Sequence, residues 1–184
     1  MNIPNLLTLL RIVLIPVLVV GFYLPVTWAP EFCASVFGLA SITDWLDGYL
    51  ARRLGQSSPF GAFLDPVADK LMVAVALILL VQGDPDPFLA IPAAVIVGRE
   101  IAISGLREWM AELGKRAHVA VSSVGKFKTT AQMVAILLLL YHDPLFGLPT
   151  VTVGYVFMYV AAVLTLWSMV VYMRAAWPAL RAEQ

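Results

Sequence analysis

Long apolar runs follow one another along the chain and are separated by short polar or proline-containing stretches. Each run is close to the roughly 20 residues that a helix needs to cross a bilayer. Turns are indicated at LPVTWAPEF, QGDPDP, AELGKRAHVAVSS and HDPLFGLP, where proline, glycine and acidic residues interrupt the apolar pattern. The pattern predicts six transmembrane helices, at about residues 5–24, 30–52, 59–81, 88–109, 124–141 and 151–174.

The N-terminal end of the first run has a polar face. Asn2, Asn5, Thr8 and Arg11 recur every third residue among leucines and isoleucines, which predicts an amphipathic segment at the membrane interface, with Pro16 marking the turn inward. Arg11 lies inside the apolar run and not before it, which argues against a cleaved signal peptide. Asn5 and Thr8 are candidates for lining a site, and simple interfacial polarity explains them equally well.

Composition supports a membrane setting. Of the 184 residues 61% are hydrophobic, and the mean hydropathy is +0.88, which is too apolar for a soluble domain of this length. No linker or repeat divides the chain, so we expect one all-α integral membrane domain over residues 1–184. The single cysteine, Cys33, excludes an internal disulfide and a multi-cysteine metal site.

The charged residues predict an orientation. All twelve Lys and Arg residues belong to the two termini, the connection between the second and third helices, and that between the fourth and fifth. The other three turns carry only Glu31, Asp84, Asp86 and Asp143. Because positive charge collects on the cytoplasmic side of membrane proteins, both termini should be cytoplasmic. No nucleic-acid partner is expected.

Four aspartates between residues 44 and 69 contradict the apolar background. At the centre of a bilayer they would cost on the order of 10 kcal/mol on insertion scales if nothing neutralised them. Asp44 and Asp47 share a helical face of about 100° with the small residues Gly48 and Ala51. Asp65 and Asp69 are four residues apart on the next helix, which a short loop makes an antiparallel neighbour. The four acids should therefore converge near the cytoplasmic surface.

Hard divalent cations are the natural partners of such a cluster. They prefer carboxylate oxygens, and two of them would balance four aspartates while leaving coordination positions for phosphate. Ordinary polar helix ends would not need four acids at helical spacing beside small residues. A cation-coupled transporter is the alternative from another class. It would distribute acids through the bilayer depth and show two related halves, and neither is evident here.

A resemblance to a known family rests on eight positions. Asp44, Asp47, Gly48, Ala51, Arg52, Gly61, Asp65 and Asp69 match the signature D-x-x-D-G-x-x-A-R-x8-G-x3-D-x3-D. This pattern resembles that of the CDP-alcohol phosphatidyltransferase family. Similarity to bacterial members extends over most of the chain, including NIPNLLTLLRIVLIP, DPVADK, GREIAISGLREWMAELGK and GKFKTTAQM.

The resemblance implies an activity and roles for the signature residues. The family exchanges the CMP of a CDP-linked lipid such as CDP-diacylglycerol for an alcohol. It implies two ions, Mg²⁺ or Mn²⁺, on Asp44, Asp47, Asp65 and Asp69, with Asp69 also the general base. It assigns Gly48, Ala51, Arg52 and Gly61 to the cytidine nucleotide. It further implies a homodimer that is located in the bacterial inner membrane and surrounded by its lipids. The active site would face the cytoplasm.

The acceptor alcohol is less constrained. Likeness along the whole chain favours sn-glycerol 3-phosphate in anionic phospholipid biosynthesis, whereas serine, an inositol phosphate and phosphatidylglycerol remain alternatives. A phosphorylated acceptor needs a second basic cluster on the cytoplasmic side. Cytoplasmic topology alone would also explain each candidate, and the candidates are Arg11, Lys70, Arg99, Arg107, Lys126 and Lys128.

Overall fold

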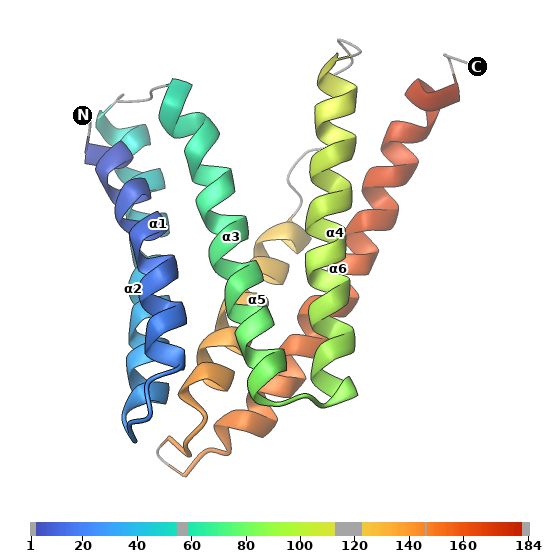
Figure 1. The fold of residues 1–184 in the computed structure, drawn as a ribbon. Coiled ribbons are helices and arrows are strands. Elements are labelled where there is room, and N and C mark those ends of the chain that lie inside the picture. The colour runs from blue at the N-terminus through green and yellow to red at the C-terminus, as the bar shows by residue number, and fades with distance from the viewer. Residues whose placement is uncertain (1–2, 55–58, 113–122, 146, 182–184) are drawn as a thin grey trace.

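The chain forms a bundle of six α-helices (Figure 1) in the computed structural model, which describes residues 3–54, 59–112, 123–145 and 147–181. No strand occurs in these ranges. The expected all-α membrane fold with six helices is confirmed. The helices are α1 (Ile3–Phe22), α2 (Ala29–Leu54), α3 (Pro59–Gly83), α4 (Pro87–Glu112), α5 (Ser123–Tyr141) and α6 (Thr150–Arg181).

Three of the described helices are long and apolar enough to cross a membrane on their own. They are α1, α4 and α6, and the apolar part of α5, Phe127–Tyr141, is shorter. The C-terminal half of α2 and the N-terminal half of α3 carry the acidic motif. Its charges lower the hydropathy of these two helices. The last helix extends past its expected end at Arg174 to Arg181, since Ala175 and Ala176 favour continuation of a helix.

The N-terminal helix contains the proline at which a turn inward was expected. Residues 3–22 form one continuous helix with Pro16 inside it. Thr8 and Arg11 are buried, whereas Leu6 and Val13 are 59% and 58% exposed. The polar face of α1 therefore points into the protein, while Leu6 and Val13 point outward and Leu14 and Leu18 join the core. Packing of α1 against α2 and α3 keeps the helix continuous although Pro16 removes one backbone hydrogen bond.

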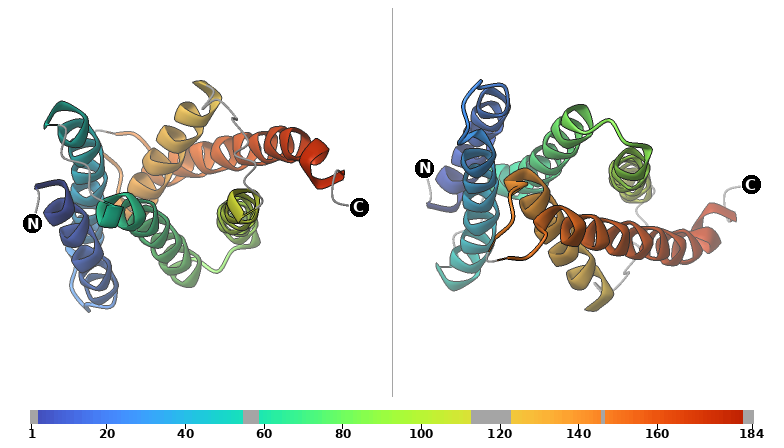
Figure 2. Two further views of the ribbon diagram at one scale, coloured as in Figure 1. Left: turned by 90° about the horizontal axis from the view of Figure 1, so that it is seen from above. Right: turned by 90° about the horizontal axis from the view of Figure 1, so that it is seen from below.

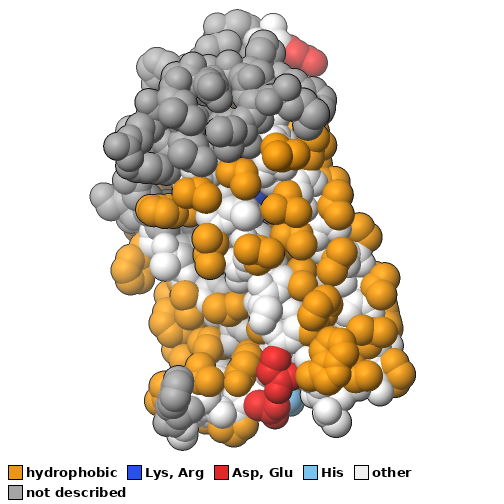
Figure 3. All heavy atoms as spheres, turned by 90° about the vertical axis from the view of Figure 1, so that its left-hand side faces the viewer, with side chains coloured by type: hydrophobic (Ala, Val, Ile, Leu, Met, Phe, Trp, Pro, Cys, Tyr) orange, Lys and Arg blue, Asp and Glu red, His pale blue; other side chains and the backbone are white. Residues whose placement is uncertain are grey.

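Every helix contributes to one hydrophobic core. Leu18, Phe37, Leu77, Ile96, Ile136 and Met158, one from each helix, are almost completely buried. Hydrophobic side chains also cover the middle of the outer face over α1 and α2 (Figure 3), with acidic side chains near its lower edge. A helix bundle surrounded by lipid needs apolar side chains both in its core and on its outer surface.

Viewed along the bundle (Figure 2), α1 and α2 lie at one side, α4 and α6 at the other, and α3 and α5 between them. Both chain termini lie at the same end of the bundle (Figure 1), together with the ends of α2 and α4 and the start of α3. The motif acids are therefore near the end that carries the termini.

Small residues on α6 are used inside the bundle. A Cβ atom at Gly154 would lie 2.8 Å from Cγ of Leu139, so α5 and α6 approach each other closely here. Ala161 and Ala162 are also buried, at 0% and 6% exposure. These three residues serve packing between helices of one chain.

Candidate active site

The four motif aspartates surround a side chain from α1. Asp44 and Asp47 belong to α2, and Asp65 and Asp69 to α3. The Nη1 atom of Arg11 lies 3.0 Å from Oδ1 of Asp44. The same guanidinium forms ion pairs with Asp47 through Nη2 and with Asp69 through Nη1. One cation from the first helix thus contacts three of the four acids.

The fourth acid is also contacted by α1. The hydroxyl of Thr8 donates a hydrogen bond to Oδ1 of Asp65. Thr8 and Arg11 are three residues apart, so they project from one helical face, and Asn5 is half-buried one turn earlier. Thr8 and Arg11 are 0% and 1% exposed. The polar face of α1 therefore lines the acidic cluster.

The acids differ in their access to the outside. The side chain of Asp47 is 4% exposed, whereas those of Asp44 and Asp69 are 38% and 37% exposed. A buried carboxylate is costly unless it is paired, and Arg11 supplies that partner for Asp47. Asp44 and Asp69 remain accessible to a ligand that arrives from outside the bundle.

The four aspartates offer the type of oxygen ligand that a divalent cation binds. Their arrangement around Arg11, however, is not that of a formed metal site. Among the described residues, no group of three or more His, Cys, Asp or Glu side chains is placed so that it could hold an ion. Carboxylate oxygens are nevertheless what Mg²⁺ and Mn²⁺ prefer. The guanidinium shows that this position accommodates positive charge. Arg11 contacts one oxygen each of Asp44, Asp47 and Asp69, so a metal would bind carboxylates that already pair with the guanidinium through one oxygen.

The positions expected to hold the nucleotide adjoin the acids. Gly48 follows Asp47 and is half-buried, and Gly61 is buried near the start of α3. Ala51 and Arg52 lie on α2, but their side chains are outside the described part of the structure. The assignment of these four residues to cytidine stays a prediction.

A second polar cluster joins α4, α5 and α6. Oε1 of Glu100 lies 2.9 Å from Nη1 of Arg99 and accepts a hydrogen bond of 2.6 Å from Nζ of Lys128. Nη2 of Arg99 donates to Oγ of Ser168 at 3.0 Å. The side chains of Arg99 and Lys128 are 9% and 7% exposed. Two buried cations are therefore held by one shared carboxylate.

The other expected acceptor ligands lie around this cluster. Nζ of Lys70 donates to Oγ of Ser104 across the α3–α4 interface at 2.5 Å. Arg107 donates to the hydroxyl of Tyr172 at 2.6 Å, and its guanidinium carbon lies 5.0 Å from the centre of that ring, a cation–π contact. The side chain of Lys126 is outside the described part.

A cavity of about 500 Å³ lies between α3 and α4. Its polar lining comes from Lys70, Glu100, Ser104 and Glu108, and Leu71 and Ile96 are among its apolar lining. Glu100 also holds the two buried cations. None of the four motif aspartates lines this cavity, so it adjoins the basic cluster and not the acids.

The structure groups the predicted cations in two places. Arg99 and Lys128 share Glu100, and Lys70 faces the same cavity, whereas Arg11 lies with the acids. Sequence reasoning missed Glu100, Ser104, Ser168 and Tyr172. Glu100 carried a signal, because a carboxylate beside an arginine within an apolar run needs a partner. Ser168 carried none, since a helical serine commonly bonds its own backbone, as Ser168 also does to Thr165.

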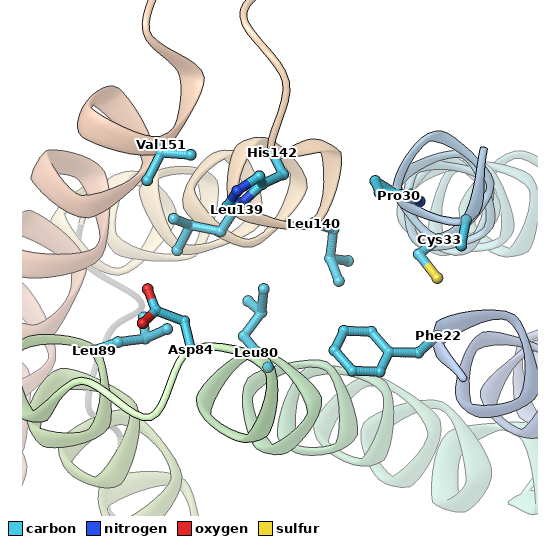
Figure 4. A pocket seen from close by; sticks show the side chains of 12 residues that line it. Phe22, Pro30, Cys33, Leu80, Asp84, Leu89, Leu139, Leu140, His142 and Val151 are labelled. Atoms are coloured by element: carbon cyan, nitrogen blue, oxygen red, sulfur yellow. The ribbon is translucent and has the colours of Figure 1, made fainter. Parts of the chain in front are cut away.

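Another cavity, of about 270 Å³, lies at the opposite end of the bundle (Figure 4). Phe22, Leu80 and Leu140 are among its largely apolar lining, and Asp84 and His142 are its charged or titratable members. Oδ2 of Asp84 already accepts a hydrogen bond of 2.9 Å from the Tyr155 hydroxyl. The cavity shares no residue with the acidic cluster, so we place the candidate active site at the other end.

The fold and the acidic site together are those of a membrane-embedded transferase, and the comparisons agree. Residues 1–167 match the CDP-alcohol phosphatidyltransferase family, and the chain belongs to this family. A protein of Pseudomonas fluorescens is 58% identical over 184 residues, which are 100% of this chain and 94% of the relative. One of Escherichia coli (strain K12) is 56% identical over 178 residues, 95% of this chain and 94% of the relative.

Both relatives have the name CDP-diacylglycerol–glycerol-3-phosphate 3-phosphatidyltransferase, as does a protein of Shigella flexneri serotype 5b (strain 8401). The Shigella protein is 57% identical over 178 residues, 95% of this chain and 94% of its own length. Enzymes of the family generally use a divalent metal. The expected family and enzyme class are thus confirmed.

Proposed function

We propose that this protein transfers the phosphatidyl group of CDP-diacylglycerol to sn-glycerol 3-phosphate and releases CMP. The names of relatives that are 56–58% identical over almost their whole length support this reaction. The structural observation that carries the proposal is the convergence of Asp44, Asp47, Asp65 and Asp69 at one end of the bundle. Few other functions require four carboxylates at that depth in an apolar protein.

The transfer replaces the phosphoanhydride bond of the donor with a phosphate ester bond to the acceptor. The acceptor hydroxyl oxygen attacks the phosphorus that carries diacylglycerol, and the bond from this phosphorus to the CMP oxygen breaks. CMP leaves with the bonding electron pair. Asp69 takes the proton of the attacking hydroxyl, and its side chain is exposed enough to meet a substrate.

The motif acids would hold two divalent ions, Mg²⁺ or Mn²⁺. When bound, these ions neutralise the pyrophosphate and the negative charge that develops on departing CMP. Asp44 and Asp69 have accessible carboxylates that could bind these ions, and the buried Asp47 would contribute a ligand from the protein interior. Gly48, Ala51, Arg52 and Gly61 would bind the cytidine nucleotide beside them, where small residues permit close approach to the backbone.

The basic cluster would bind the acceptor phosphate. Arg99 and Lys128 are held together by Glu100, and Lys70 lies across the shared cavity. Arginine and lysine are the usual phosphate ligands, and Lys70, which follows Asp69 in the sequence, would bring the acceptor towards the acids. Lys126, Arg107 and Arg11 complete the proposed set.

The proposed setting follows from the charges. The basic residues lie at the end that carries the termini, so we place both termini and the active site on the cytoplasmic side of a bacterial inner membrane. One domain over residues 1–184 is proposed because one core contains side chains from all six helices. The proposed homodimer rests on family resemblance.

The decisive experiment measures CMP release by the purified, detergent-solubilised protein. It receives CDP-diacylglycerol and Mg²⁺, with glycerol 3-phosphate, serine or inositol phosphate in separate reactions, and EDTA in a control. Release that requires both metal and glycerol 3-phosphate is expected. Release with another alcohol would keep the chemistry and replace the acceptor. No release with any acceptor from a folded preparation would refute the proposal.

A further inference from the structure

Arg11 makes contacts that the transfer reaction does not explain. Its two terminal nitrogens contact Asp44, Asp47 and Asp69, and the side chain is 1% exposed. These carboxylates are three of the four proposed metal ligands. A divalent cation on the same carboxylates would lie close to the guanidinium, and the two positive charges would repel each other.

The charges and hydrogen bonds around Arg11 are unbalanced. One guanidinium contacts three carboxylates, those of Asp44, Asp47 and Asp69, so its single positive charge is shared among them. The Nε atom of Arg11 is also buried, with no hydrogen-bond partner among the described residues. Arg11 thus holds three acids together without satisfying all of its own donors.

We propose that Arg11 is an internal counter-ion that competes with divalent metal for Asp44, Asp47 and Asp69. It keeps the carboxylates of α2 and α3 paired until metal binds, and metal then displaces its guanidinium. This inference rests on the metal assignment of the proposed function. It makes Arg11 a positioning residue that limits metal affinity and stabilises the protein before metal is bound.

Competition has a definite thermodynamic consequence. The free energy of metal binding includes the loss of the ion pairs of Arg11, so the measured affinity is weaker than that of the acids alone. Removal of Arg11 should therefore strengthen metal binding. It should also destabilise the metal-free protein, because buried carboxylates lose their partner.

The test measures Mn²⁺ binding to the full-length protein in detergent by electron paramagnetic resonance, without lipid or acceptor. We expect Arg11→Gln to lower the dissociation constant for Mn²⁺ by at least about tenfold, since it removes competing charged hydrogen bonds. In EDTA the thermal unfolding midpoint of Arg11→Gln should be lower than that of the wild type. Saturating Mn²⁺ should raise the midpoint of the variant by more than it raises that of the wild type.

Two further variants separate contact from charge. Arg11→Lys keeps the charge but cannot span three carboxylates, so its Mn²⁺ affinity should lie between those of the wild type and Arg11→Gln. Arg99→Gln removes a buried cation outside the acidic cluster and should leave Mn²⁺ affinity unchanged. If Arg11→Gln does not fold, Arg11→Lys alone decides the question.

Unchanged or weaker Mn²⁺ binding by folded Arg11→Gln would overturn the inference, as would an Arg11→Lys affinity equal to that of the wild type. Because no substrate is present, these outcomes are independent of the CMP-release assay. A wild-type protein that binds Mn²⁺ but releases no CMP would refute the proposed function and leave the competition intact. A wild-type protein that binds no Mn²⁺ would refute the competition, and CMP release would still report on the reaction.

Discussion

The ammonium nitrogen of Lys128 lies 2.6 Å from Oε1 of Glu100, and this ion pair joins α5 to α4. Lys128 is one of the cations proposed to bind the acceptor phosphate, so it should affect one substrate more than the other. We expect Lys128→Met to raise the KM for glycerol 3-phosphate by about tenfold or more, the value of a charge-assisted hydrogen bond. Steady-state CMP release with each substrate varied in turn measures the effect.

The KM for CDP-diacylglycerol in the same variant is the control and should change little. Lys126→Ala should show the same asymmetry, since Lys126 is another proposed ligand of the acceptor phosphate. Equal increases of KM for donor and acceptor in both variants would contradict a role in acceptor binding.

Glu100 should stabilise the protein because it neutralises two buried cations. In Glu100→Gln, Arg99 and Lys128 lose their shared counter-charge, and we expect the free energy of unfolding to fall by about 1–3 kcal/mol. The lower part of the range for buried pairs applies because Glu100 is 26% exposed. Thermal unfolding in detergent measures this change. Glu112→Gln, at an exposed position on the same helix, should leave the midpoint unchanged.

Asp47 should be indispensable for turnover. Its side chain is more buried than those of Asp44 and Asp69, and Asp47→Asn removes its charge with little change of shape. We expect CMP release to fall at least about 100-fold, as for other electrostatic groups at reacting centres. Asp84→Asn makes the same change at the opposite end of the bundle and should retain most of the activity. Loss of activity in both variants would indicate a general effect on folding.

Thr8 should contribute through its hydrogen bond to Asp65. Thr8→Val keeps the shape but removes the donor, so we expect turnover to fall about fivefold, which corresponds to roughly 1 kcal/mol. Thr43→Val is the matched control, because Thr43 is also buried but bonds only to the backbone of its own helix, at 2.8 Å to Ala40 and 3.0 Å to Leu39. Similar turnover of the two variants would mean that the Thr8 contact is not used in the reaction.

The proposed orientation can be tested by thiol labelling in intact cells. Cys33 is 2% exposed, and Cys33→Ser gives a background without thiols. In this background Asp143→Cys should react with a membrane-impermeant reagent from outside, while Glu112→Cys should react only after permeabilisation of the inner membrane. The opposite pattern would place the acidic site outside the cytoplasm.

The sequence predicted the six helices well because each apolar run is about as long as a bilayer is thick. It also placed Asp44 with Asp47, and Asp65 with Asp69, because helical periodicity alone determines which face each pair shares. Pro16 lies inside a continuous helix, which packs against α2 and α3.

The partners of the acids were decided only by the tertiary structure. Arg11 and Asp69 are 58 residues apart, and Thr8 and Asp65 are 57 apart, so no periodicity relates them. Which side chains of α1 meet the acids depends on how α1 packs against α2 and α3. The composition and spacing of the chain therefore indicated that a cation or water had to meet the acids. The packing of three helices, which places Arg11 in a buried position among carboxylates, decided which residue within the protein could fill that role.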